Sequence, residues 1–119
     1  MKLDHIVLLV SDLPKSVAFY EHLLPMLGFR KSADHVYGNS DEVYLDIRQA
    51  EKVEHAYERF APGLNHIGFT APNRDAITQI QDNMKDAGYD VPEVQVFGED
   101  VAIFLKDPDG MRIELSVYK

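Results

Sequence analysis

Near its start the sequence reads Leu3-Asp4-His5-Ile6, and 61 residues later it reads Leu64-Asn65-His66-Ile67. After each copy come an apolar run typical of a strand, a residue able to cap a helix, a helical pattern, and a glycine followed by an aromatic residue. Self-similarity that keeps its order over several elements indicates an internal structural repeat. The sequence therefore predicts two similar halves, each containing one helix and several strands.

The two helices are predicted from their capping residues and from the spacing of apolar side chains. Asp12 precedes the first, expected over about residues 13–27, and Asn73 precedes the second, over about 74–87. Such side chains accept hydrogen bonds from the free N–H groups of a first helical turn. Pro25 lies late in the first pattern, so we expect it to kink or loosen the last turn.

The remaining apolar segments indicate strands, and a turn of sequence Asp107-Pro108-Asp109-Gly110 joins the last two. Besides the strands that open each half, we expect strands at about 30–36, weakly around 37, and at 43–49, 90–97, 101–106 and 111–118. We predict an α+β fold in a single domain over residues 1–119. Two βαβββ modules, about 1–50 and 63–119, would form a cupped eight-stranded mixed sheet with the helices on its outer face.

Strand alternation places four potential metal ligands on one side of this sheet. Each ligand lies on a different strand, and the opposite face of that strand is purely apolar. The four residues are His5, His66, Glu114 and Asp46. If the sheet is cupped, these side chains point into one cavity. Two imidazoles and a carboxylate on rigid strands make an open site for a divalent ion, which can polarise a substrate oxygen. The alternative from the residues alone is that these histidines are structural and bind no metal.

Asp46 and Glu114 are the candidate catalytic residues. A carboxylate beside a metal ion can move a substrate proton when its pKa suits the reaction. Asp46 would be a fourth metal ligand or a general base. The alternative for Asp46 is an ion pair with Arg48 or Arg112, which share its side of the predicted sheet.

Composition narrows the classes of function. There is no cysteine, which excludes disulfides, thiol catalysis and cysteine-ligated zinc. The other histidines, His22, His35 and His55, are expected on the surface. A net charge of −8 disfavours nucleic acid and anionic membrane surfaces. The apolar run near the N-terminus is too short for a signal peptide or a membrane span. We therefore expect a soluble cytoplasmic protein.

Four groups of motifs resemble the vicinal oxygen chelate superfamily, which includes glyoxalase I, extradiol dioxygenases and bleomycin-resistance proteins. They lie at residues 3–6, 18–29, 63–69 and 104–115, so the resemblance covers essentially the whole chain. It implies that His5, His66 and Glu114 bind the metal. Glyoxalase I-like members usually have a further glutamate ligand where this sequence has Asp46, whose side chain is one methylene shorter.

The resemblance favours a metal-dependent enzyme acting on a small substrate that chelates the ion through neighbouring oxygens. A lyase or isomerase reaction, or a dioxygenase reaction, fits, and one divalent ion (Zn, Ni, Mn or Fe) is implied. Relatives of this size commonly form homodimers. The first alternative is a non-catalytic small-molecule-binding protein similar to bleomycin-resistance proteins. The second is a thiol transferase similar to fosfomycin-resistance proteins, although the last strand has few of the basic residues that a phosphonate pocket needs.

Overall fold

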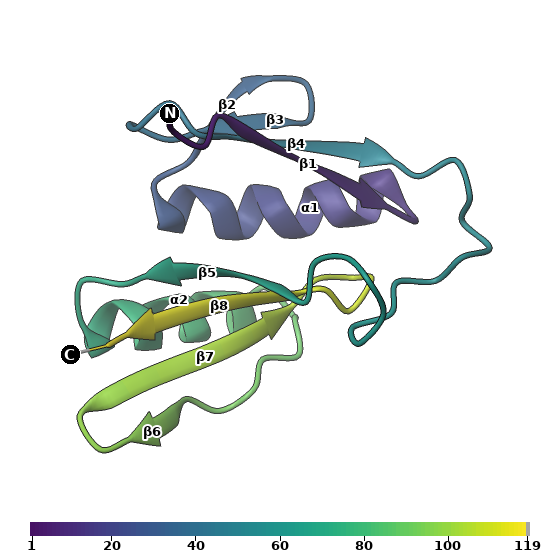
Figure 1. The fold of residues 1–119 in the computed structure, drawn as a ribbon. Coiled ribbons are helices and arrows are strands. Elements are labelled where there is room, and N and C mark those ends of the chain that lie inside the picture. Colours follow the sequence, from purple (N-terminus) through teal and green to yellow (C-terminus); the bar gives the residue numbers. More distant parts are fainter. Residues whose placement is uncertain (119) are drawn as a thin grey trace. The chain divides into compact units, whose positions relative to one another are not determined.

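The computed structural model describes residues 1–118. The chain forms two compact units, Met1–Ala56 and Tyr57–Lys119. Each unit has a four-stranded mixed sheet and a helix that packs on one face of it (Figure 1). The fold is therefore α+β with a paired βαβββ plan, as the repeat in the sequence predicts.

The first unit contains one α-helix, one short 3₁₀ helix and four strands. In its sheet the strand order is β1-β4-β3-β2, with β1 and β4 parallel and the other pairs antiparallel. Helix α1 contacts β4. The elements are β1 (His5–Val10), α1 (Leu13–Leu23), η1 (Leu24–Leu27), β2 (Arg30–Ala33), β3 (Val36–Gly38) and β4 (Tyr44–Gln49).

The second unit repeats this plan. Its strand order is β5-β8-β7-β6, with β5 and β8 parallel and the other pairs antiparallel. Helix α2 contacts β7 and β8. The elements are β5 (His66–Thr70), α2 (Arg74–Asp86), β6 (Gln95–Phe97), β7 (Asp100–Lys106) and β8 (Arg112–Val117). Among the described residues, no helix is both long and apolar enough to cross a lipid bilayer.

The helix ends follow the capping signals. The Asp12 side chain accepts a hydrogen bond from the Lys15 amide at 3.2 Å, and the Asn73 side chain accepts one from the Ala76 amide at 2.9 Å. Pro25 lies where the α-helix gives way to the tighter turn η1, so the predicted loosening of the last turn is confirmed.

Each unit has its own core between its helix and its sheet. Alternate strand residues face the helix and are almost fully buried, whereas the residues between them face away. The largest buried side chains come from both the helices and the strands. They are Phe19, Tyr20, Leu23, Leu24, Tyr37 and Ile47 in the first unit, and Ile77, Met84, Ile103, Leu105, Ile113 and Leu115 in the second.

Two predicted strands are shorter than the sequence suggests. The strand expected over residues 30–36 breaks into β2 and β3 at a turn in which His35 has a positive φ of 64°. In the second unit only Gln95–Phe97 of the expected 90–97 is a strand. Pro92 lies in the part that is not, and a proline cannot donate to a strand ladder. Apolar runs alone therefore overestimated the length of both strands.

Tyr37 gives the first unit a pH-dependent stability. Its side chain is buried and its hydroxyl donates to the Glu21 carboxylate at 3.3 Å. Burial, with the nearby Glu21 charge, raises the pKa of Tyr37 to about 12. A free tyrosine has a pKa of about 10, so the unfolded chain loses this proton first as the pH rises. The free energy of unfolding should therefore fall between about pH 10 and pH 12.

Urea denaturation at a series of pH values, followed by circular dichroism, tests this expectation. Tyr37→Phe removes the titrating group while keeping the ring in the core. The variant should lose less stability than the wild type over the same alkaline range. If both proteins lost stability in parallel, Tyr37 would not contribute to the alkaline transition.

Candidate functional site

His66 and Glu114 lie together on the sheet face that points away from α2. They come from the parallel strands β5 and β8, where Glu114 is opposite Gly68. A Cβ atom at Gly68 would lie 3.8 Å from Glu114 Oε2, so the carboxylate lies close to the backbone of this glycine. The His66 Nε2 and Glu114 Oε2 atoms are 3.1 Å apart, with the Glu114 side chain 10% exposed and the His66 ring 39% exposed. The structure thus brings together two of the predicted metal ligands.

The second oxygen of Glu114 is held by Tyr118. The Tyr118 hydroxyl donates a hydrogen bond to Oε1, and the same bond is the main cause that raises the pKa of Tyr118. Tyr118 follows Glu114 by four residues, so strand alternation brings its side chain to the same face. The carboxylate is therefore held from one side and presents its other oxygen to His66.

Two neighbours orient the His66 ring. The Asn65 Oδ1 atom lies 2.8 Å from His66 Nδ1, and the Asn65 amide nitrogen donates to the Arg59 carbonyl at 3.0 Å. Phe104, opposite Glu114 in β7, meets the His66 ring edge-on with the ring centroids 6.0 Å apart. Both contacts leave Nε2 facing Glu114.

The loop before His66 is itself anchored. The Tyr57 hydroxyl lies 2.6 Å from the Leu64 carbonyl oxygen and 3.0 Å from that of Asn65. Both carbonyls can only accept, so the hydroxyl proton is shared between them. This contact ties the residues just before β5 to the first residue of the second unit.

His5 has a similar environment in the first unit. Its Nδ1 atom lies 2.7 Å from the Asp4 carboxylate, and its ring is 57% exposed. The hydrogen bond from His5 lowers the pKa of Asp4. His5 lies on the same face of β1 as the exposed side chains of Val7 and Leu9, whereas Leu8, facing the helix, is buried.

Asp46 is paired with an arginine. It lies on β4 opposite Val7, on the face of the sheet that carries His5. Arg48 approaches one Asp46 oxygen with both Nη2, at 2.5 Å, and Nε, at 2.8 Å, and this contact raises the pKa of Arg48. Of the two roles considered for Asp46, the structure contains the ion pair with Arg48.

The remaining histidines lie on the surface, as expected. His22 is exposed on α1, His35 is exposed in the turn between β2 and β3, and His55 is exposed beside Glu54 at 3.9 Å. Within residues 1–118, neither unit by itself gathers three or more histidine or acidic side chains within reach of one ion. The candidate ligands that share a face within one unit are His66 and Glu114 in the second unit, and His5 and Asp46 in the first.

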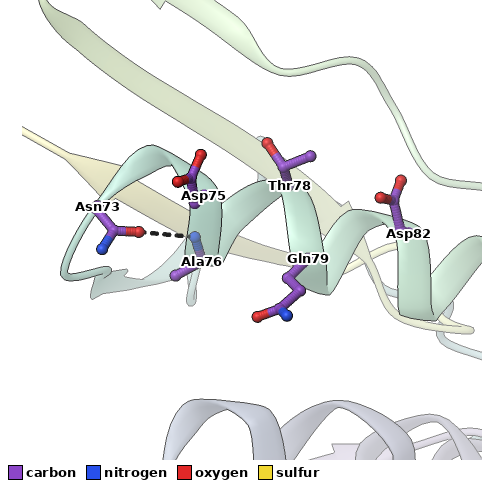
Figure 2. A pocket seen from close by; sticks show the side chains of 6 residues that line it. All are labelled: Asn73, Asp75, Ala76, Thr78, Gln79 and Asp82. Atoms are coloured by element: carbon purple, nitrogen blue, oxygen red, sulfur yellow. Dashed lines mark hydrogen bonds between the residues drawn. The ribbon is translucent and has the colours of Figure 1, made fainter.

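A shallow hollow runs along the exposed face of α2 (Figure 2). Its lining contains two carboxylates, Asp75 and Asp82, and no histidine or basic side chain. The Asn73 amide oxygen caps the helix, and the Thr78 hydroxyl donates to the Arg74 carbonyl at 3.2 Å. These groups serve the helix itself, so the hollow is the solvated face of α2. The lining residues are Asn73, Asp75, Ala76, Thr78, Gln79 and Asp82.

Three residues that contact the predicted ligands had no role assigned from the sequence. Two of them, Asp4 and Asn65, belong to the repeated motif and directly precede His5 and His66. The recurrence of a side chain with an acceptor oxygen before each histidine is the sequence signal that could have identified them. Tyr118 shares the strand face of Glu114, but alternation alone does not show which polar neighbour a carboxylate contacts.

Comparisons with known proteins agree with the fold. Residues 2–115 match the family model of the glyoxalase/bleomycin resistance protein/dioxygenase superfamily. The chain is 33% identical over 123 residues to the uncharacterized protein YqjT of Bacillus subtilis, covering 95% of this chain and 96% of that one. It is 29% identical over 130 residues to a lactoylglutathione lyase of Salmonella typhimurium, covering 100% of this chain and 94% of that one.

A solved structure shares the fold at low sequence identity. The glyoxylase/bleomycin resistance protein/dioxygenase domain from Frankia sp. EAN1pec superposes with a TM-score of 0.81 at 16% identity, covering 100% of this chain and 93% of that one. Because the family model spans nearly all of the sequence, the chain belongs to the glyoxalase/bleomycin resistance protein/dioxygenase superfamily.

Proposed function

We propose that this protein is a metal-dependent enzyme in which His5, His66 and Glu114 bind one divalent ion. The substrate class is a small molecule that offers neighbouring oxygen atoms to the ion. Zinc, nickel, manganese and iron all accept such a set of nitrogen and oxygen ligands. When bound, the ion polarises a carbonyl or enolate oxygen of the substrate as a Lewis acid.

The contact between His66 and Glu114 is the observation that supports this proposal most. His66 Nδ1 faces the amide oxygen of Asn65, which can only accept, so Nδ1 carries a proton. In a neutral ring Nε2 is then also an acceptor, yet it lies 3.1 Å from a carboxylate oxygen. Two acceptors repel at this distance unless a cation lies between them, either a metal ion or the second proton of an imidazolium. Atoms bound to one ion at about 2.1 Å are separated by roughly 3.0–3.4 Å, which matches the pair.

The sheet topology supports a site built from both halves. His5 is on β1 and His66 is on β5, and each of these strands is the outermost strand of its sheet. Outer strands have one backbone edge available for pairing. An ion bound by both histidines would therefore take its ligands from an outer strand of each sheet.

Asp46 and Glu114 are the proposed proton-handling groups. Glu114 presents Oε2 toward the site while Tyr118 holds Oε1. Asp46 lies near His5 on the neighbouring strand, but Arg48 occupies one of its oxygens. Asp46 would accept a substrate proton, or bind the ion, through its second oxygen, with Arg48 fixing the carboxylate orientation.

The relatives favour a lyase-type reaction over the other chemistries of the superfamily. The Salmonella typhimurium protein, which is similar over this whole chain, is a lactoylglutathione lyase. For a reaction of that class, carboxylates such as Asp46 and Glu114 would be the groups that accept or return a substrate proton.

Titration of the metal-free protein with each of the four ions, by calorimetry and elemental analysis, tests the proposal. We expect about one ion per chain for at least one of the metals. His66→Ala should abolish this binding because it removes a ligand. His22→Ala, which removes an exposed histidine on α1, is the matched control and should bind as the wild type does. Absence of binding for all four ions would reject the metal-dependent proposal.

A second candidate function is metal-free binding of a small apolar molecule. Val7 and Leu9 are exposed on the same strand face as His5, with 41% and 61% of their surfaces accessible. Exposed apolar side chains on one face of a sheet are suited to contacting a ligand or a partner. The metal titration separates the two candidates, because a metal-free binding protein needs neither His66 nor an ion.

A further inference from the structure

The residue before each candidate histidine contacts that histidine in the same way in both halves. Asp4 Oδ2 lies 2.7 Å from His5 Nδ1, and Asn65 Oδ1 lies 2.8 Å from His66 Nδ1. The two contacts belong to separate units and are built by residues 61 positions apart. The repeat therefore includes the contact between each histidine and the residue before it, as well as the two histidines themselves.

The orientation of the Asn65 amide is fixed by a second bond. Its nitrogen donates to the Arg59 carbonyl at 3.0 Å, so its oxygen is the atom that faces the His66 ring. An amide oxygen has no proton to donate, and Nδ1 must therefore be the donor. In a neutral imidazole this leaves the electron pair on Nε2, the nitrogen that faces Glu114.

The Asp4 carboxylate acts on His5 in the same direction. An ionised carboxylate only accepts hydrogen bonds, so it also selects the ring form with the proton on Nδ1. Hydrogen bonds with a charged partner are stronger than those between neutral groups. A carboxylate behind an imidazole also makes the opposite nitrogen more basic, whereas an amide does so less. The two halves thus hold their histidines with acceptors of unequal strength.

We propose that Asp4 and Asn65 are positioning residues that set His5 and His66 to the tautomer with the proton on Nδ1 and the electron pair on Nε2. The proposal rests on the proposed function, because that tautomer is the one suited to binding an ion through Nε2. It adds a specific role for two residues that do not themselves reach the ion.

Three variants separate the effect of the acceptor from that of the loop. Asn65→Leu keeps the size of the side chain but removes the acceptor and the bond to Arg59. Asn65→Asp keeps an acceptor, which becomes a charged carboxylate like that of Asp4, and loses the bond to Arg59. Tyr57→Phe loosens the same loop by removing the contacts with the Leu64 and Asn65 carbonyls, while leaving the amide of Asn65 in place.

The first readout is the nitrogen NMR spectrum of the histidine rings in the metal-free protein near pH 8, where free imidazoles are neutral. Nδ1 of His66 should carry a proton in the wild type, in Asn65→Asp and in Tyr57→Phe, whether or not Nε2 also carries one toward Glu114. In Asn65→Leu the population should move toward the form with the proton on Nε2. If Nδ1 of the wild-type ring carries no proton, or if Asn65→Leu leaves the protonation of Nδ1 unchanged, the proposal is wrong.

The second readout is metal affinity. Loss of a hydrogen-bond partner behind a ligating histidine typically weakens metal binding about 10–100-fold. We expect this loss for Asn65→Leu, and a change of only a few-fold for Asn65→Asp. An equal loss in both variants would assign the effect to the loop and overturn the positioning role. The tautomer is measured without metal, so a wild type that has the expected tautomer but binds no ion would reject the proposed function alone.

Discussion

Replacing Glu114 with glutamine should weaken divalent-metal binding by at least about 100-fold. Changes in the groups that merely support metal ligands cost up to this much, so removing the charge of a ligand should cost no less. Glutamine has nearly the same shape and can still accept the Tyr118 hydrogen bond, which preserves the packing around this buried side chain. Calorimetric titration of the metal-free variant measures the loss.

Two further variants make the result specific. Tyr118→Phe keeps the carboxylate and removes only the hydrogen bond to Oε1, so its loss of affinity should be about tenfold. Glu99→Gln removes a carboxylate from the turn between β6 and β7 and should change nothing. If Glu114→Gln bound metal with wild-type affinity, Glu114 would not be a ligand. If Glu99→Gln lost as much affinity as Glu114→Gln, the loss would come from the change in the protein's net charge and not from a missing ligand.

The face on which each candidate ligand lies could be predicted from the sequence, because alternation along a strand is a property of the backbone. In β1 the side chains of Leu8 and Val10 are buried against the helix, whereas Val7 and Leu9 are exposed beside His5. The same alternation places Glu114 beside His66, and the distance between these two side chains confirms that they share a face.

The partner that each side chain takes on that face could not be predicted in the same way. Asp46 and Arg48 are two residues apart on β4, so alternation puts both on the face that carries His5. A long, flexible arginine side chain can reach back to such a carboxylate, and in the structure it does so at 2.5 Å. The contact between Tyr118 and Glu114 has the same origin. Alternation gives the set of polar groups on a face, but their reach decides which of them pair.

Helix ends could be predicted from the sequence more accurately than strand ends. Asp12 and Asn73 cap their helices through local hydrogen bonds, and local bonds can be read from neighbouring residues. The end of β2 depends instead on the turn at His35, where a residue other than glycine adopts a positive φ. Sequence patterns do not signal such a conformation strongly, because it is held by the strands on either side.

Replacing Asp107 with alanine should lower the free energy of unfolding by roughly 2–4 kcal/mol, because two backbone N–H groups lose their acceptor. Asp107 Oδ1 accepts from the Asp109 amide at 2.9 Å and from the Met111 amide at 3.0 Å. Asp107 and Met111 are both buried, so water cannot easily replace these bonds. Urea denaturation followed by circular dichroism measures the change.

Asp107→Asn is the matched control, since its side-chain oxygen can accept the same two bonds, and its loss should stay within about 1 kcal/mol. The turn also connects β7 to β8, whose register places Phe104 opposite Glu114. A slip of one residue would move Glu114 to the face that packs on α2. The backbone bond from the Gly110 amide to the Asp107 carbonyl, at 2.9 Å, does not involve the side chain and should hold the register in the folded fraction. Asp107→Ala should therefore unfold more easily yet bind metal normally when folded, whereas a parallel loss of stability and metal affinity would mean that the side chain itself sets the register.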